Sequence, residues 1–281
     1  MLNELTRKTF GFDFENWVTQ GYFEGDYIPY SFLSDGKVIS NVSANIMKFN
    51  QNGTEKKYIQ IGTVMTDEAF RKQGLAGKLI EHVLDEYKDQ CDGIYLFGNL
   101  DAIGFYEKMN FKTENQYRYF VKEEYCNFLS DDEENGVNCF KLIKNMNDEI
   151  KNRYFELVRN NVCNSSLEQI NKYGLQMFYT AGLDDVFYAK DIDCFIVLEQ
   201  GENLELKSII SNSIIPLEEI LRRIKSDKNK CILGFTPKDE DKDKCICEEY
   251  DGADDYRLFY MGEELEAIHK EKMYFPDLSH A

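Results

Sequence analysis

Apolar and polar positions in the first third of the chain follow a pattern that predicts a β-hairpin and then a helix. Two strand-like segments, "KVISNVSANIMKF" and "KYIQIGTVMT", flank the dipeptide Asn52-Gly53, which is a strong hairpin signal. Residues 71–87 then begin with glycines and continue with apolar side chains at helical spacing. These side chains form one stripe that we expect to be buried: Leu75, Ala76, Leu79, Ile80, Val83, Leu84 and Tyr87.

The same order of elements continues and then recurs in the second half. In the first half a buried strand, a shorter helix and a further strand are expected at residues 94–99, 101–110 and 111–121. In the second half a hairpin that turns at Gln200-Gly201 precedes a helix over 216–225 and a strand over 230–235. The pattern predicts an α+β fold, with mixed, mainly antiparallel sheets flanked by helices.

The middle of the chain carries the expected boundary between two domains. A chain of 281 residues is long enough for two cores of ordinary size. An acidic segment at residues 130–138 interrupts the apolar pattern, and a helical pattern over 150–158 follows it. We therefore expect two domains of related architecture, at residues 1–132 and 138–281.

The formal net charge of −18 narrows the range of partners. Such a charge repels phosphodiester backbones, so nucleic acid is not expected as a partner. No apolar run is long enough to cross a bilayer, and the first residues lack the pattern of a signal peptide. A cytoplasmic protein without a membrane partner is the resulting expectation.

Eight scattered cysteines suit reduced thiols that pack as small apolar side chains. Only Cys245 and Cys247 lie close together, and this spacing without a second pair or a nearby histidine is a weak metal signal. The acidic segments 131–135 and 238–244 lack the ligand pattern of a calcium loop. No metal site is expected.

The glycines at the start of the predicted helix suggest a phosphate site. Arg71, Lys72 and Gln73 precede Gly74, shortly after a strand that ends at Thr66. The unpaired N–H groups of a helix's first turn carry partial positive charge, and glycine permits a phosphate group to approach them closely. The spacing is neither that of a Rossmann fingerprint nor that of a P-loop, and glycine also occurs near helix starts for packing reasons.

Two linked motifs resemble the GNAT superfamily of acyl-coenzyme A-dependent N-acetyltransferases. The first is Gln or Arg, two residues, Gly, one residue, and then Gly or Ala, which residues 71–76 match. The second, "NLDAIGFYEKMNF", follows at residues 99–111 and departs from the family pattern at Asn110, where glycine is usual. The end of the chain, "MYFPDLSHA", is similar to that of bacterial members with a second GNAT-like domain. The resemblance therefore implies tandem GNAT-like domains. The second would be degenerate because its helix start, "SNSIIP", has neither Gly nor Arg.

The resemblance also implies acetyl-coenzyme A as cosubstrate and assigns residues to it. Backbone groups of Val64, Met65 and Thr66 would hold the pantetheine arm. Asn99 would contact the coenzyme at the end of the next strand. The pyrophosphate would be bound around the glycine by Arg71, Lys72, Gln73, Gly74, Leu75 and Ala76. Tyr106 would donate its phenolic proton to the departing thiolate, and packing in the core is the alternative for this side chain.

The acceptor site and the general base have several candidates. The strand before the glycine turn carries no carboxylate that could act as the base. Glu24 and Asp26 lie in an aromatic segment that also contains Tyr22, Tyr27 and Tyr30. The two acids could shape an amine pocket with these rings, or they could form an acidic turn between packed aromatic side chains. No cysteine falls in either motif, so direct attack by the amine is expected rather than an acetyl-cysteine intermediate.

The last residues, "FPDLSHA", combine an apolar anchor with a proline, a histidine and the carboxylate of Ala281. This ending suggests a docked terminus, and the acceptor cleft of the first domain is one place where it could dock. There His280 or the carboxylate of Ala281 could accept the proton of the amine. The alternative is that Phe275 and Leu278 simply pack against the second domain.

Two functions from different classes follow from these patterns. The first is an N-acetyltransferase that acts on a primary amine of a small molecule or a peptide. The second is a non-catalytic protein that binds or senses acyl-coenzyme A, with the second domain as a partner surface. The intact glycine turn and Tyr106 favour the first. The acceptor is selected by variable loops, so the sequence pattern identifies neither the acceptor nor the oligomeric state.

Overall fold

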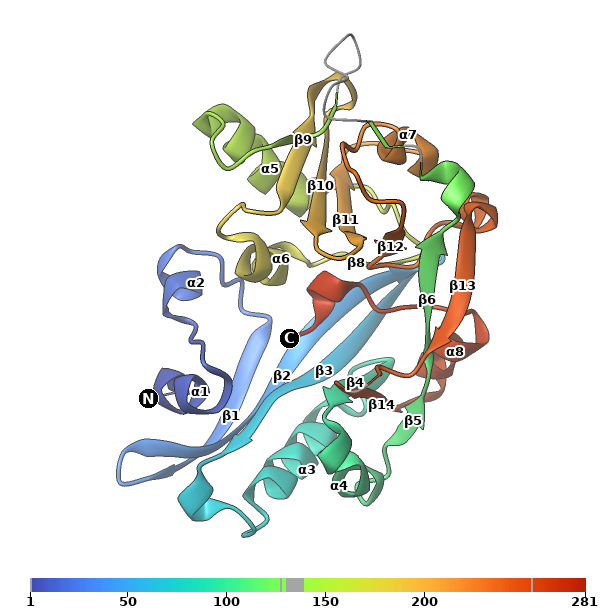
Figure 1. The fold of residues 1–281 in the computed structure, drawn as a ribbon. Coiled ribbons are helices and arrows are strands. Elements are labelled where there is room, and N and C mark those ends of the chain that lie inside the picture. The colour runs from blue at the N-terminus through green and yellow to red at the C-terminus, as the bar shows by residue number, and fades with distance from the viewer. Residues whose placement is uncertain (1, 127, 130–138, 254) are drawn as a thin grey trace.

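Two seven-stranded sheets make up the protein, and helices cover their faces (Figure 1). The structure is a computed structural model that describes residues 2–126, 128–129, 139–253 and 255–281. In the first sheet the strands lie in the order β1 (Tyr27–Ser34), β2 (Lys37–Gln51), β3 (Thr54–Thr66), β4 (Gly93–Gly98), β14 (Arg257–Met261) and β5 (Lys112–Glu114), and β8 (Leu167–Gln169) also pairs with β2. In the second sheet the order is β13 (Cys245–Tyr250), β6 (Gln116–Val121), β12 (Cys231–Leu233), β11 (Leu204–Ser211), β10 (Cys194–Gln200), β9 (Val186–Ala189) and β7 (Lys141–Leu142).

The α+β prediction is confirmed, because most paired strands are antiparallel and helices flank both sheets. The parallel pairs of named strands are β3 with β4 and β11 with β12, so the same arrangement occurs once in each sheet. The α-helices are α1 (Leu2–Phe10), α2 (Glu15–Thr19), α3 (Leu75–Tyr87), α4 (Ile103–Glu107), α5 (Asp148–Asn160), α6 (Tyr173–Thr180), α7 (Leu217–Leu221) and α8 (Ala267–Lys270). Within the described residues, none of them combines the length and the apolar character that crossing a membrane requires.

The predicted hairpin is formed by β2 and β3, and it turns at the predicted dipeptide. Asn52 and Gly53 both adopt left-handed backbone angles, with φ of 48° and 85°. Two successive positive φ values are typical of a type I′ turn, whose twist matches that of the strands it joins. The strong local signal therefore fixed both the turn and the pairing of the two longest strands.

Helix α3 packs its predicted apolar stripe on the first sheet. Leu79, Ile80, Val83 and Tyr87 are buried in a core cluster with residues of β2, β3 and β4. The helix predicted over residues 216–225 is shorter in the structure, where α7 ends at Leu221. The N–H groups of Arg223 and Ile224 each donate to the carbonyl three residues back, and this tighter winding ends the α-helix.

The two sheets exchange strands across the middle of the sequence. The strand predicted at residues 111–121 breaks into β5, which stays in the first sheet, and β6, which pairs with β12 and β13 of the second sheet. In return β14, from the last part of the chain, lies between β4 and β5 of the first sheet. Each sheet therefore contains strands from both sides of the predicted boundary at residues 132–138. A separation into domains 1–132 and 138–281 stays a prediction, and its acidic segment at 130–138 lies outside the described residues.

The strand exchange predicts that the two sheets unfold together. Phe259 of β14 is fully buried in the core of the first sheet, although it comes from the C-terminal part of the chain. We expect Phe259→Ala to lower the free energy of unfolding by about 3–5 kcal/mol, the usual cost of a large cavity in a core. Urea unfolding followed by circular dichroism should show one transition that moves as a whole.

Leu33→Ala is the matched control, because Leu33 is 57% exposed on β1. Its effect should stay within about 0.5 kcal/mol. Two separate transitions, of which Phe259→Ala shifts only one, would contradict the coupling of the sheets.

Candidate active site

The candidate site begins at a gap between two neighbouring strands of the first sheet. β3 and β4 pair in parallel only over residues 58–60 of β3. Beyond that point two residues of β3 lie opposite one residue of β2, and Thr63 there has a left-handed φ of 41°. Such a bulge bends the strand and turns it away from its neighbour. In the part of the chain that the structure describes, the β4-facing edge of β3 has no strand partner beyond residue 60.

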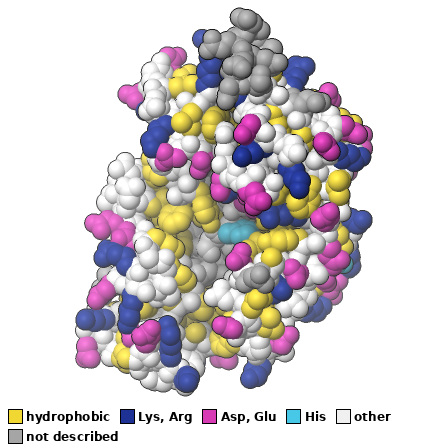
Figure 2. Space-filling view, viewed as in Figure 1, with side chains coloured by type: hydrophobic (Ala, Val, Ile, Leu, Met, Phe, Trp, Pro, Cys, Tyr) yellow, Lys and Arg dark blue, Asp and Glu magenta, His cyan; other side chains and the backbone are white. Residues whose placement is uncertain are grey.

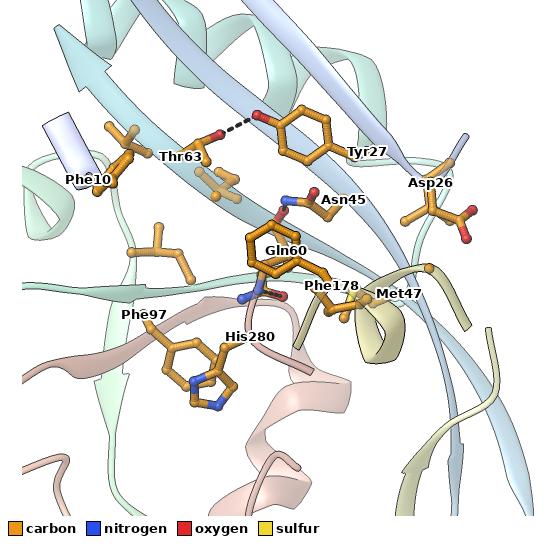
Figure 3. Close-up of a pocket in the computed structure, with 18 of the residues that line it drawn as sticks. Phe10, Asp26, Tyr27, Asn45, Met47, Gln60, Thr63, Phe97, Phe178 and His280 are labelled. Atoms are coloured by element: carbon orange, nitrogen blue, oxygen red, sulfur yellow. Dashed lines mark hydrogen bonds between the residues drawn. The ribbon is translucent and has the colours of Figure 1, made fainter. Parts of the chain in front are cut away.

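A cavity of about 680 Å³ lies in and beside this gap. Its walls come from residues 10–27, the middle of β2 and β3, the end of β4, helices α4 and α6, and the last two residues of the chain. Apolar side chains surround the hollow on the face drawn in Figure 2, and Figure 3 shows how side chains from these segments converge. The cavity is therefore built jointly by segments that belong to both halves of the sequence.

The predicted site residues fall into two groups in the structure. Those that line the cavity are Glu24, Asp26, Tyr27, Val64, Asn99, Tyr106, His280 and Ala281. Those that do not are Met65, Thr66, Arg71, Lys72, Gln73, Gly74, Leu75 and Ala76. The second group continues from the end of β3 to the first turn of α3, so the two groups are contiguous through Val64.

The start of α3 presents an exposed turn with two positive charges. Arg71, Lys72 and Gly74 are exposed, and Gly74 caps the helix with a left-handed φ of 74°. No atom lies within 4 Å of the point where a Cβ on Gly74 would be, apart from its chain neighbours. Open space therefore lies in front of the first-turn N–H groups, and the local charge is positive. This combination suits a phosphate group.

Tyr106 belongs to the core and to the cavity wall at once. Its ring packs against that of Phe259, with 5.0 Å between the ring centroids, and only 5% of the residue is exposed. Gly98 permits this packing, because a Cβ there would lie 2.7 Å from the Tyr106 ring. Burial raises the pKa of Tyr106 to about 12, so its hydroxyl keeps its proton at neutral pH. Tyr106 therefore packs in the core, which was the alternative for this side chain, and it also lies at the edge of the cavity.

Tyr27 contributes to the wall, whereas two neighbouring tyrosines do not. The Tyr27 hydroxyl lies 2.8 Å from Oγ1 of Thr63, at the bulge of β3 (Figure 3). Tyr30 does not line the cavity, and its hydroxyl meets that of Tyr87 on α3 at 3.0 Å. Tyr22 packs against rings of α5 and α6. The expectation that Tyr22 and Tyr30 share a pocket with Tyr27 is wrong. Tyr22 packs against α5 and α6, and Tyr30 packs against α3.

The two carboxylates of this segment have different surroundings. Glu24 forms an ion pair with Arg159 of α5. Asp26 accepts a hydrogen bond of 2.9 Å from Nδ2 of Asn171, and among the described residues no cation lies within ion-pair distance of it. Burial raises the pKa of Asp26, since desolvation penalises its charged form. Glu24 is therefore neutralised by the protein, and Asp26 is not.

The end of the chain docks in the cavity, as one of the two predictions for it expected. The N–H of Ala281 donates to Oε1 of Gln60 at 3.1 Å, and the Tyr179 hydroxyl donates to the carbonyl of His280 at 2.5 Å. The imidazole of His280 stacks on Phe97, with 3.9 Å between ring centroids (Figure 3). Burial lowers the pKa of His280 to about 4, so the ring is neutral at neutral pH.

The alternative, that Phe275 and Leu278 pack against the second domain, agrees with the contacts of Leu278 and not with those of Phe275. Leu278 lies in a core cluster with residues of α5, α6 and the second sheet, while Phe275 stacks on Tyr95 of the first sheet at 4.3 Å. Sequence reasoning missed Gly62, where a Cβ would lie 2.5 Å from the backbone oxygen of Ala281. A glycine inside a strand signals close approach of another chain segment, and this signal could have revealed the contact.

The corresponding helix start in the second half is occupied by the protein itself. The N–H of Leu217, the first residue of α7, donates to a carboxylate oxygen of Asp241 at 3.2 Å. The described residues contain no cluster of His, Cys, Asp and Glu that could hold a metal ion. In β13, Cys245 is buried and Cys247 is exposed, although residues two apart in a strand lie on the same face.

Comparisons with known proteins show which family and which fold the chain resembles. Residues 3–111 match the sequence model of the acetyltransferase (GNAT) family. No curated protein sequence matches the chain. Among solved structures, the chain resembles a conserved protein of unknown function from Enterococcus faecalis V583, described as a probable N-acyltransferase. The identity is 16% and the TM-score 0.56, over 96% of this chain and 70% of that chain.

Two further solved structures share the fold. A GCN5-related N-acetyltransferase from Kribbella flavida is 14% identical with a TM-score of 0.54, over 92% of this chain and 68% of that chain. One from Anabaena variabilis ATCC 29413 is 14% identical with a TM-score of 0.51, over 92% and 69%. These matches extend over more than nine-tenths of this chain, and at such low identity they show a shared fold.

The open turn at α3 generates a test with coenzyme A, the phosphorylated ligand that the resemblance implies. Gly74→Glu should abolish its binding in calorimetry, because a carboxylate would stand in front of the first-turn N–H groups and repel the phosphates. Gly36→Glu is the matched control. Gly36 has φ of 75°, open surroundings and a place in the turn between β1 and β2, so the cost of a left-handed side chain is the same. Equal affinities of the two folded variants would contradict a phosphate site at α3.

Proposed function

Since residues 3–111 of this chain belong to the acetyltransferase (GNAT) family, we propose that the protein is an N-acetyltransferase. It would transfer an acetyl group from acetyl-coenzyme A to a primary amine of a small molecule or a peptide. The observation that carries the proposal is the gap between β3 and β4, which joins an exposed cationic helix start to a cavity with Tyr106 in its wall. A binding site for a long phosphorylated donor and a separate acceptor chamber are what such a transfer requires.

The residues present fit the coenzyme. The exposed turn of Arg71, Lys72 and Gly74 suits its pyrophosphate, and the open edge of β3 near Val64 suits its amide-containing arm. Asn99 lies across the gap from that edge, at the end of β4. When bound, acetyl-coenzyme A supplies the reactive thioester. Met65 and Thr66 hold β3 in place from its other edge, through hydrogen bonds to Ser40.

We assign the proton donor to Tyr106. Its pKa of about 12 keeps the hydroxyl protonated, so it can give a proton to a thiolate as the carbon–sulfur bond breaks. No cysteine lines the cavity among the described residues, which favours direct attack of the amine on the thioester carbonyl carbon. The new carbon–nitrogen bond replaces the carbon–sulfur bond, and the amine loses one proton to a base.

We assign the base to the docked end of the chain. His280 and the carboxylate of Ala281 were the two candidates, and both residues line the cavity. Burial lowers the pKa of His280 to about 4, which is close to that of a carboxylate, so basicity does not separate the two candidates. The carboxylate of Ala281 lies against Gly62 of β3, beside the gap, and therefore has the better position.

We further propose one coenzyme site per chain, in the first of the two GNAT-like units. The start of α7 is already occupied by the Asp241 carboxylate and lacks a cationic turn. Calorimetry should therefore give a stoichiometry of one. The localisation expected from the sequence, in the cytoplasm, and a division at residues 132 and 138 remain parts of the same proposal.

The function is tested by an acceptor screen. Acetyl-coenzyme A is mixed with the protein and with amines of several classes, and the free thiol is measured. Thiol release that depends on an amine supports the transferase. Coenzyme binding without release by any amine would instead favour a protein that binds or senses acyl-coenzyme A.

The role of Tyr106 yields a prediction about turnover. Tyr106→Phe removes only the hydroxyl and should lower kcat by about 10²-fold, with little change in the affinity for coenzyme A. Tyr58→Phe is the matched control, because its buried hydroxyl donates to Gln51 away from the cavity. An unchanged kcat in Tyr106→Phe would show that Tyr106 serves packing and not proton transfer.

The assignment of the base is tested by removing its candidates in turn. Deletion of residues 279–281 should abolish turnover while coenzyme A still binds, because both candidate bases are lost. His280→Gln should keep more than about a tenth of the activity, because the carboxylate of Ala281 remains beside the gap as the base. Full activity in the deletion variant would eliminate the docked end as the base.

A further inference from the structure

We propose that the acceptor is a primary amine carried on an apolar frame, such as an arylalkylamine, and that Asp26 attracts its positive charge. This inference rests on the proposed function, since it names the class of amine that the same cavity would take. It excludes two other classes of amine: those rich in hydroxyl groups, and those that carry a carboxylate. Three features of the wall lead to it.

The first feature is an aromatic wall on the acceptor side. Rings of Phe12, Phe14, Trp17 and Phe178 contact one another with centroid distances of 5.5 to 6.1 Å. They come from the N-terminal segment and from α6, on the side of the cavity away from α3. Aromatic faces bind apolar groups and also attract cations. A substrate in this chamber therefore gains most from an apolar body.

The second feature is that three of the five side-chain amides that line the wall already donate to the protein. Nδ2 of Asn45 donates to the Gln60 carbonyl at 2.9 Å, and Nδ2 of Asn171 donates to Asp26 and to the Ile46 carbonyl. Nε2 of Gln169 donates to the Asn171 carbonyl at 3.3 Å. Binding a sugar-like amine would require many free donors and acceptors. With three of its amides taken up in this way and most of its other groups apolar, the wall offers such an acceptor fewer hydrogen bonds than water does.

Two buried atoms of the wall, Oε1 of Gln169 and Nε2 of His280, have no hydrogen-bond partner among the described residues. The Gln169 oxygen can only accept, whereas the imidazole nitrogen donates or accepts according to its tautomer. A buried polar atom without a partner is costly, and a ligand N–H is a group that satisfies it. The Gln169 oxygen thus needs a donor from a ligand, which suits an ammonium or amine.

The third feature is the charge of the wall. No lysine or arginine lines the cavity in the described part of the chain, and His280 is neutral there. Glu24 is neutralised by Arg159, whereas Asp26 has only the longer-range influence of Lys48. The net field of the acceptor chamber is therefore negative and repels a carboxylate.

Asp26 acts across the sheet rather than by direct contact with the reacting amine. Its neighbour Tyr27 pairs with Asn45 of β2, and Asn45 pairs with Gln60 of β3, so about two strand spacings, or roughly 10 Å, separate Asp26 from the gap. At this distance and at an effective dielectric constant of about 20, a charge pair changes an equilibrium by about tenfold. A measurable effect on KM is expected without an effect on the chemical step.

The binding test uses Trp17, the one tryptophan of the sequence, which lines the cavity. Its fluorescence reports ligand entry without any turnover. The probes are 2-phenylethylamine, its uncharged analogue 2-phenylethanol, glucosamine and phenylalanine. We expect 2-phenylethylamine to change the fluorescence at a concentration at least about tenfold lower than the other three. Binding of glucosamine or phenylalanine as tight as that of 2-phenylethylamine would overturn the proposal.

Asp26→Asn tests the attraction of charge. The amide keeps an oxygen that can accept the hydrogen bond from Asn171, so the wall stays intact. We expect KM for 2-phenylethylamine to rise about tenfold and kcat to stay unchanged, while the affinity for 2-phenylethanol does not move. Asp35→Asn is the matched control, since it removes one negative charge in the exposed turn between β1 and β2. Equal KM values for the two variants would show that Asp26 does not attract the amine.

The two proposals fail in different ways. If 2-phenylethylamine binds but no amine causes thiol release, the proposed class of ligand stands and the transferase function does not. If thiol release occurs only with glucosamine or other polar amines, the transferase stands and the acceptor class is refuted.

Discussion

The parting of β3 and β4 after residue 60 is the constraint on which the rest of the site depends. Two neighbouring strands in a sheet normally satisfy each other's backbone groups, and a bulge at Thr63 ends this arrangement by bending one of them. The opened edge leaves backbone groups free beside a cavity. Helix α3 begins shortly after the end of the bent strand, so the position of its exposed first turn also depends on this bend.

The exchange of strands between the sheets brings both halves of the chain to the cavity at this opening. β14 fills the position beside β4 from the C-terminal part of the chain, and β6 leaves for the second sheet. The chain that follows β14 then returns to the gap, where Gly62 lets Ala281 approach β3. Helix α6 supplies the opposite wall. Neither half of the sequence contains a complete site, because each half completes a sheet and a wall of the other.

The two sides of the site differ in charge. The α3 side carries Arg71 and Lys72 on an exposed turn, which suits a phosphorylated group. On the acceptor side Asp26 is without a neighbouring cation, and burial keeps His280 neutral. The opposite signs suit an anionic group at the helix start and a cationic group in the cavity. Tyr106, protonated because it is buried, stands in the wall of that cavity.

The sequence by itself determined the features that depend on near neighbours. The turn at Asn52-Gly53, the stripe of α3 and the glycine start of that helix all follow from local geometry, and two motifs were enough to indicate the family. Tertiary structure decided the rest, because strand exchange and cavity walls join residues more than a hundred positions apart. The segment with Tyr22, Tyr27 and Tyr30 illustrates the limit. Its aromatic pattern was plain, but only packing decided that Tyr27 faces the cavity while Tyr30 meets α3.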